Sequence, residues 1–187
     1  MASSKEASPI LDPEKIYESF PHLTENNHKP TSNATPEPPV SNAYCIYNCF
    51  AFVIGDETKF WWPNDEYSYW PHSNAPDSVQ ELVSVLEEHN YEECNDGSYE
   101  KGVQKIAIFE NRGDAVHVAI QPPYRNGIWK SRMQYNIDIE HDDLGSLETW
   151  PEDDPSRQGY GRAVKFMRLR KSRKNRKSTV IQASRRA

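Results

Sequence analysis

The chain has 187 residues, a net charge of −6 and three cysteines, which together argue against several classes of protein. No apolar run approaches the roughly 18 residues of a membrane-spanning helix, and the first residues lack the apolar stretch of a secretory signal. An odd cysteine count gives no disulfide framework, which is typical of a reducing compartment. We therefore expect an intracellular protein, cytoplasmic or nuclear, without a membrane partner.

Charge and proline content divide the chain into three parts. Residues 1–41 hold seven of the 14 prolines, whereas residues 42–170 hold all five tryptophans and all three cysteines. Residues 168–187 carry nine Lys and Arg and no acid, so the preceding residues carry 13 basic and 28 acidic side chains, a net −15. We expect an N-terminal extension with a Pro-rich linker over 1–41, one domain over 42–170, and a disordered basic tail over 171–187.

The basic tail could serve as a contact for a charged partner. It could bind nucleic acid or an import receptor, or it could pair with the acidic body of its own chain. The acidic body itself disfavours nucleic acid and acidic substrates at the domain.

Helical segments come first along the chain. Residues 12–20 predict a short helix with Pro13 near its first turn. Residues 42–56, NAYCIYNCFAFVIGD, predict a buried helix of about three turns that stops at Gly55. A strand fits the same segment, because its apolar residues are distributed all round.

An aromatic loop and a second helix come next. The loop, FWWPNDEYSYWP at 60–71, could line a groove for a substrate, a peptide or a sugar. It fits better as a cover that closes the core over the first helix, because aromatic side chains bury the most area. An amphipathic helix then spans 78–89, with Asp77 or Ser78 as its cap.

Four strand-like segments follow, and their β-branched and aromatic residues favour that assignment. They are residues 103–110, 115–121, 128–135 and 161–170. The sequences NRGD and YRNG supply turns between the first three, so these strands should form antiparallel hairpins. Helices first and hairpins afterwards predict an α+β fold.

Cys49 and His117 are the candidate catalytic pair. Cys49 lies near the start of the first predicted helix, where backbone N–H groups and the helix dipole favour the nucleophilic thiolate. His117 lies on the second predicted strand and could act as general base and then general acid. Each also has an ordinary structural role open to it, because cysteine often packs as a small hydrophobe and lone histidines are often structural.

A third group would be needed to orient the imidazole. Ser131 is a candidate because it lies on the strand expected to pair with the His117 strand. His141 is the substitute, in a run that also contains Asp138 and Glu140 and that could equally be an exposed acidic loop.

Metal binding is not expected. Cys45 and Cys49 are four residues apart and would share a helix face, and Cys94 or His117 could join them around zinc. Structural zinc sites usually show two close pairs of ligands, and this sequence has one loose pair. We therefore predict neither a metal nor another cofactor.

A series of ordered motifs resembles an uncharacterised domain family. Its members share YNC-x-A, WWP, YWP, G-Y-E-x-C, H-x-A-x-Q, W-x-S-[KR], DIEH and a terminal YG. The matching segments are 47–52, 61–63, 69–71, 90–94, 117–121, 129–132, 138–141 and 160–161. The resemblance covers about residues 14–170 and is specific through the number and order of the motifs.

That family is similar in turn to the papain-like group of NlpC/P60 and CHAP domains. The resemblance implies an α+β, papain-like (NlpC/P60-like) core, with a Cys-bearing helix packed on an antiparallel sheet of four or more strands. It implies a thiol hydrolase or acyltransferase acting on an amide or ester, with Cys49 as nucleophile, His117 as base and Ser131 in the third slot. The Cys49 N–H would hold the oxyanion, with Asn48 or Tyr47 as the second donor.

Contacts with the substrate are predicted for residues of the loop and of its surroundings, namely Asn48, Trp61, Trp62, Trp70 and Arg132. Ser131 differs from the His, Asn, Gln or acid expected in the third slot, and Arg132 replaces the family's Lys. A catalytically inactive interaction module of the same fold, using the aromatic loop and the basic tail, is therefore the alternative to the enzyme.

Overall fold

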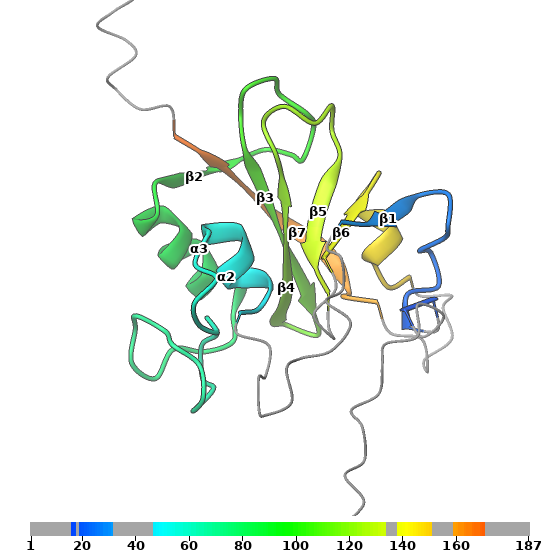
Figure 1. Cartoon of the computed structure of the whole chain (residues 1–187). Helices are drawn as coiled ribbons and strands as arrows, with labels where there is room; N and C mark the ends of the chain where they lie inside the picture. The colour runs from blue at the N-terminus through cyan, green and yellow to red at the C-terminus, as the bar shows by residue number, and fades with distance from the viewer. Residues whose placement is uncertain (1–15, 18, 32–46, 134–137, 151–158, 171–187) are drawn as a thin grey trace, which may run out of the picture.

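The structure is a computed structural model that describes residues 16–17, 19–31, 47–133, 138–150 and 159–170. These residues form a seven-stranded antiparallel sheet with strand order β1-β6-β5-β4-β3-β7-β2 (Figure 1). The strands are β1 (His28–Pro30), β2 (Tyr91–Cys94), β3 (Lys105–Asn111), β4 (Asp114–Gln121), β5 (Trp129–Arg132), β6 (Asp138–His141) and β7 (Arg162–Leu169). The helices are α2 (Cys49–Ile54), α3 (Val79–Glu88) and the 3-10 helix η2 (Gly145–Leu147).

This architecture corrects the expected fold class. We predicted an α+β, papain-like core, but the described residues are mainly β, with one large sheet and two short α-helices. The Cys-bearing helix α2 has only six residues, because Asn48 caps its start and Gly55 ends it at a φ of +80°. The sheet is larger than the sequence pattern indicates, because β1, β2 and β6 extend it.

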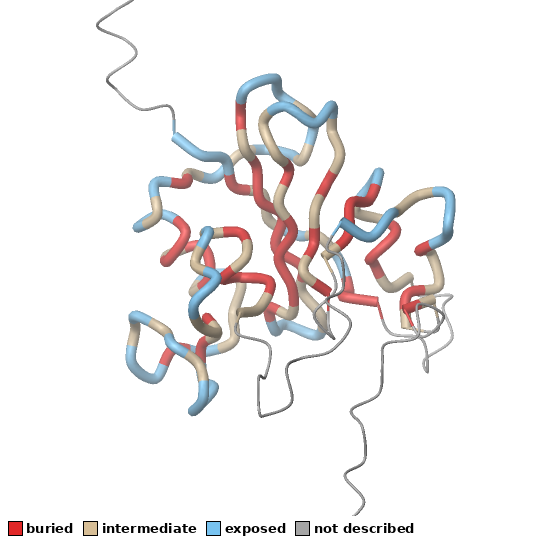
Figure 2. The backbone as a smooth tube through the Cα atoms, viewed as in Figure 1, coloured by how far each residue is buried: buried red, intermediate tan, exposed pale blue. Residues whose placement is uncertain are grey.

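The individual elements agree better with the sequence pattern than the fold class does. The four predicted strands are confirmed as β3, β4, β5 and β7, and the amphipathic helix is confirmed as α3. The Ser78 side chain caps α3 by accepting a hydrogen bond from the N–H of Glu81. The central strands β3 and β4 are largely buried (Figure 2), because both faces of the sheet are covered.

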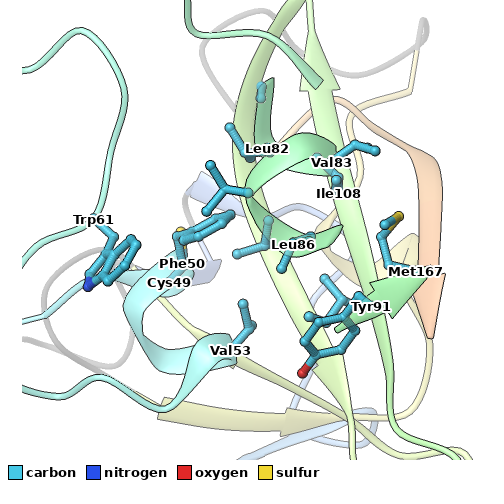
Figure 3. Close-up of a cluster of buried hydrophobic side chains, with 14 of the residues drawn as sticks. Cys49, Phe50, Val53, Trp61, Leu82, Val83, Leu86, Tyr91, Ile108 and Met167 are labelled. Atoms are coloured by element: carbon cyan, nitrogen blue, oxygen red, sulfur yellow. The ribbon is translucent and has the colours of Figure 1, made fainter. Parts of the chain in front are cut away.

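Each face of the sheet has its own hydrophobic core. Helices α2 and α3 cover one face, where Phe50 and Leu86 pack with Ile108 (Figure 3). Val118 belongs to the same cluster, which we call the helix-side core. The other face carries the opposite core, which includes Ile16, Phe20, Leu23, Ala107, Phe109, Ala119, Trp129, Ile139, Leu147 and Tyr160. Neighbouring strand residues thus belong to different cores, as the alternation of side chains in a strand requires.

The described part of residues 1–41 lies against the sheet. Ile16, Phe20 and Leu23 are buried in the opposite core, and β1 pairs with β6 so that His28 lies opposite His141. The helix predicted at 12–20 is only partly described. The segment 32–46, with Cys45, and the basic tail 171–187 lie outside the described residues, and the domain boundaries stay predictions.

Candidate functional site

The structure brings together three of the four predicted catalytic residues, His117, Ser131 and His141. They lie on the adjacent strands β4, β5 and β6. The Ser131 Oγ is 3.1 Å from His117 Nε2 and 3.0 Å from His141 Nε2. Each of the three residues is at most 1% exposed, so they form a buried hydrogen-bonded chain across three strands.

The hydrogen bonds determine which ring nitrogens carry protons. His141 Nδ1 lies 2.7 Å from the carbonyl oxygen of Asp143. A carbonyl can only accept, so Nδ1 carries the proton of neutral His141, and its Nε2 accepts from the Ser131 hydroxyl. The Ser131 oxygen then accepts from His117 Nε2–H. Donation therefore runs from His117 through Ser131 and His141 to the Asp143 carbonyl.

Burial keeps both imidazoles neutral at physiological pH. It lowers the pKa of His141 to about 4. It also lowers the pKa of His117 well below its ordinary value, with the neighbouring His141 as a second cause. A proton on either ring would place a charge in the core, which is costly unless the charge is paired. The hydrogen-bonded residues His117, Ser131 and His141 therefore suit a structural role better than proton exchange with a ligand.

The His117 ring is enclosed by aromatic side chains. Tyr160 stacks on it with ring centroids 3.9 Å apart and an interplanar angle of 6°, and the Phe109 ring centroid lies at 5.5 Å. Sequence reasoning missed this role of Tyr160. The available signal was its place in the YG motif before a strand, which indicates a turn but names no partner.

Cys49 is not part of the buried chain. It is the first residue of α2 and lies in the helix-side core, to which Val118 of β4 also belongs (Figure 3). His117 is the neighbour of Val118 in the strand and so projects from the other face, where it meets Phe109 and Tyr160. The sheet thus lies between Cys49 and His117, and the catalytic roles of the four residues stay predictions.

The Asn48 side chain is engaged within the protein. Its Oδ1 accepts from the N–H groups of Ala51, at 3.1 Å, and Trp61, at 3.3 Å. Its Nδ2 donates to the carbonyl oxygen of Trp61 at 2.8 Å. Asn48, which we predicted to contact the oxyanion, thus starts α2 and ties the aromatic loop to it.

The three tryptophans predicted to contact substrate pack mainly against the protein. Trp61 donates its Nε1–H to Asp56 at 2.8 Å, and Trp70 donates its Nε1–H to Glu81 at 2.7 Å. The rings of both lie against Phe50, and half-buried Trp62 packs against the same core. The aromatic loop therefore covers α2, which is the arrangement that the sequence favoured.

Arg132 belongs to a set of ion pairs between β5 and β6. The strand register places Lys130 opposite Glu140 and Arg132 opposite Asp138. The two pairs are 3.2 Å and 2.9 Å long, and the Arg132 guanidinium also lies 4.2 Å from the Tyr47 ring centroid. The motifs W-x-S-[KR] and DIEH therefore face each other, with their charged residues on one face of the sheet and the buried chain on the other.

Within the described ranges, no group of three or more His, Cys, Asp or Glu side chains is arranged to hold a metal ion. Among the same residues, no helix is long and apolar enough to cross a membrane.

Fold and site together define a mainly β domain with a separate core on each face of one antiparallel sheet. The chain belongs to a family described as a domain of unknown function (DUF7689), whose model matches residues 39–168. Membership of an uncharacterised domain family is thereby confirmed, whereas the individual motifs and the resemblance to papain-like domains are not. No curated protein and no solved structure matches the chain.

Proposed function

We propose that this domain is a non-catalytic interaction module. The supporting observation is that the sheet separates Cys49 from His117. A thiol nucleophile needs its base within hydrogen-bond reach, and the His117 imidazole bonds to buried Ser131 instead. The buried chain then serves to hold β4, β5 and β6 in register.

The aromatic loop is the contact surface that we assign to this module. The loop is held in place by the hydrogen bond from Asn48 to its backbone and by those of the Trp61 and Trp70 side chains described above. On this fixed frame Tyr67 is 88% exposed and Tyr69 is 43% exposed. A loop that is already ordered loses little entropy on binding, and tyrosine is enriched in protein interfaces.

Charge indicates the kind of partner. Residues 56–72 contain four acids, Asp56, Glu57, Asp65 and Glu66, and one lysine. Lys59 is engaged within this segment, because its Nζ lies 3.6 Å from the Tyr69 ring centroid and 3.8 Å from Asp56, which leaves three acids without a lysine partner there. We therefore expect a protein partner with basic side chains around an apolar patch. The basic tail, outside the described residues, stays a second candidate contact.

The test compares partners that co-purify with the tagged full chain from its own cells, measured by quantitative mass spectrometry. Cys49→Ala should retain the partner that the unaltered chain binds, whereas Tyr67→Ala should lose it by about tenfold, as for a central interface tyrosine. Val164→Ala truncates another exposed apolar side chain, 45% exposed on β7 and outside the loop, and should leave the recovery of this partner unchanged.

The opposite pattern would refute the proposal. If Cys49→Ala abolished the interaction, or if it trapped a substrate that the unaltered chain releases, the thiol hydrolase expected from the sequence would be favoured. Full retention by Tyr67→Ala would exclude the loop as the contact surface.

A further inference from the structure

A cleft of about 490 Å³ opens beside the strand β1. Its lining comes from β1, from the turn that joins β4 to β5, and from the end of β6. Its lining includes Lys29, Tyr124, Arg125, Glu140 and Asp142. The volume is within the roughly 300–1,000 Å³ of small-molecule sites. We propose that this cleft binds a small organic anion that carries a carboxylate or a phosphate.

The charged residues that line the cleft are two cations and two acids, and a third cation, Lys130, pairs with Glu140 from outside the lining. The Glu140 side chain is only 6% exposed and contacts three cations: Lys29 at 3.2 Å, Lys130 at 3.2 Å and Arg125 at 3.6 Å. One carboxylate neutralises one positive charge, so two remain. The exposed Asp142 offsets a further one, so the cluster of three cations and two acids, Lys130 included, has a net charge of +1.

Two of the cations are placed to reach a ligand. The side chains of Lys29 and Arg125 are 68% and 55% exposed, while their contact with Glu140 holds them at the wall. A guanidinium can bind a carboxylate or a phosphate through two parallel hydrogen bonds. Arg125 is therefore the residue that we expect to contact the anion directly.

Tyr124 gives the site a preference for ligands with a planar group. Its side chain is 80% exposed and lines the cleft next to Arg125. A ring attached to the anionic group could pack on the tyrosine face while the anion meets the guanidinium. Phenyl phosphate should therefore bind more tightly than inorganic phosphate.

This inference goes beyond the proposed function, because the cleft and the aromatic loop are built from different residues. If the cleft bound no anion, the proposal that the aromatic loop binds a protein would be unaffected, and the reverse also holds. The experiment is a titration of the full-length, ¹⁵N-labelled chain with phenyl phosphate, benzoate and inorganic phosphate at constant ionic strength, followed by amide chemical shifts. Saturable shifts should appear at Lys29, Arg125, Asn126 and Glu140.

Three substitutions make the result specific. Arg125→Gln should weaken phenyl phosphate by about fivefold or more, and Asp142→Asn should tighten it because a repelling charge is removed. Arg168→Gln is the matched control, since Arg168 is an exposed arginine paired with Glu92 near the other edge of the sheet. It removes the same net charge and should leave the affinity unchanged.

Other outcomes would overturn the proposal. Shifts that never saturate, or equal weakening by Arg125→Gln and Arg168→Gln, would mean that the anion only screens surface charge. If Asp142→Asn weakened binding, the negative charge of Asp142 would be part of the site, which contradicts a site for a simple anion.

Discussion

Ser131 holds the buried chain together, because its one hydroxyl bonds to both imidazoles. Ser131→Ala would leave two buried ring nitrogens without that partner. Each such loss costs about 1–3 kcal/mol, so we expect the free energy of unfolding to fall by about 2–6 kcal/mol in urea titrations.

Ser84→Ala is the control for this substitution. The Ser84 hydroxyl donates to the carbonyl oxygen of Gln80 on the surface of α3, and its loss should cost less than about 0.5 kcal/mol. If Ser131→Ala lowered the free energy of unfolding no more than Ser84→Ala does, the hydrogen bonds of Ser131 would not stabilise the sheet.

Asn48 provides a second test at the scale of single residues. Asn48→Ala removes the cap of α2 and both links to Trp61, and should lower the free energy of unfolding by about 1–3 kcal/mol. Asn48→Asp keeps the oxygen that accepts from Ala51 but loses the donor to the Trp61 carbonyl. It should therefore recover only part of the loss, as measured by urea unfolding; full recovery would mean that the link to the carbonyl is unimportant.

The sequence predicts the neighbours in the buried chain but not their surroundings. Hairpin geometry predicts that His117 and Ser131 are neighbours, and the sequence also indicates His141 as a candidate for the same site. The alternation of β4 also predicts that His117 and Val118 face opposite sides. It does not tell which side meets α2, because apolar residues line both faces of β4.

Among the secondary-structure elements, the start of β7 depends on one glycine. Gly161 has a φ of +72°, and a Cβ added there would overlap the carbonyl oxygen of Glu110 on β3. Gly55 at the end of α2 has a φ of +80°, with nothing within 4 Å of its added Cβ. The two glycines share the backbone conformation and differ in the space around them.

This contrast gives a paired prediction for thermal unfolding followed by circular dichroism. Gly55→Ala should cost about 1–2 kcal/mol, the usual penalty of a left-handed alanine. Gly161→Ala should cost at least about 3 kcal/mol more or prevent folding, because the backbone of β3 must move. Equal costs would show that β3 and Gly161 are not in this close contact.

The sequence does not predict strand β2, because the residues that stabilise it lie far away along the chain. In β2 the acids Glu92 and Glu93 disfavour a strand locally. Arg168 and Lys165 of β7 neutralise them at 2.9 Å and 2.8 Å, from 76 and 72 residues away. No local pattern contains that information. The apolar strands β3 and β4 need no distant charged partners, so their own residues are enough to predict them.

For the whole molecule, the buried histidines predict acid sensitivity. The pKa of His141 is about 4 in the folded chain, and that of His117 is also lowered. Both titrate near 6.5 when unfolded, so between about pH 6.5 and 4 the unfolded chain binds more protons. The stability contributed by these histidines is therefore complete above pH 6.5 and falls as the pH is lowered through this window.

The half-buried His72 has the opposite effect on stability at low pH. Hydrogen bonds to Glu81 and Glu88 raise the pKa of His72, so its pairing stabilises the fold at low pH. The loss of free energy of unfolding between pH 7 and 5, measured in urea, should thus be larger in His72→Gln than in the unaltered chain. A stability that is unchanged or greater at pH 5 in His72→Gln would contradict the account.

The fold class could not be predicted because it depends on the two-sided covering of the sheet. A Cys-bearing segment and later hairpins are compatible with several arrangements, and the motifs favoured a papain-like one. What decides the architecture is that Ile16, Phe20, Leu147 and Tyr160, from opposite ends of the sequence, close the face opposite α2 and α3.

We propose that Cys49 serves as a core residue and not as an activated nucleophile. The direct measurement is the rate of alkylation by iodoacetamide at about pH 6 on the folded chain, resolved by residue with mass spectrometry. Cys94 is the internal reference, since it is half-buried and burial raises the pKa of its thiol. We expect Cys49 to react about tenfold more slowly than Cys94, and equally fast in urea. A Cys49 that reacts faster than Cys94 at this pH would contradict the claim.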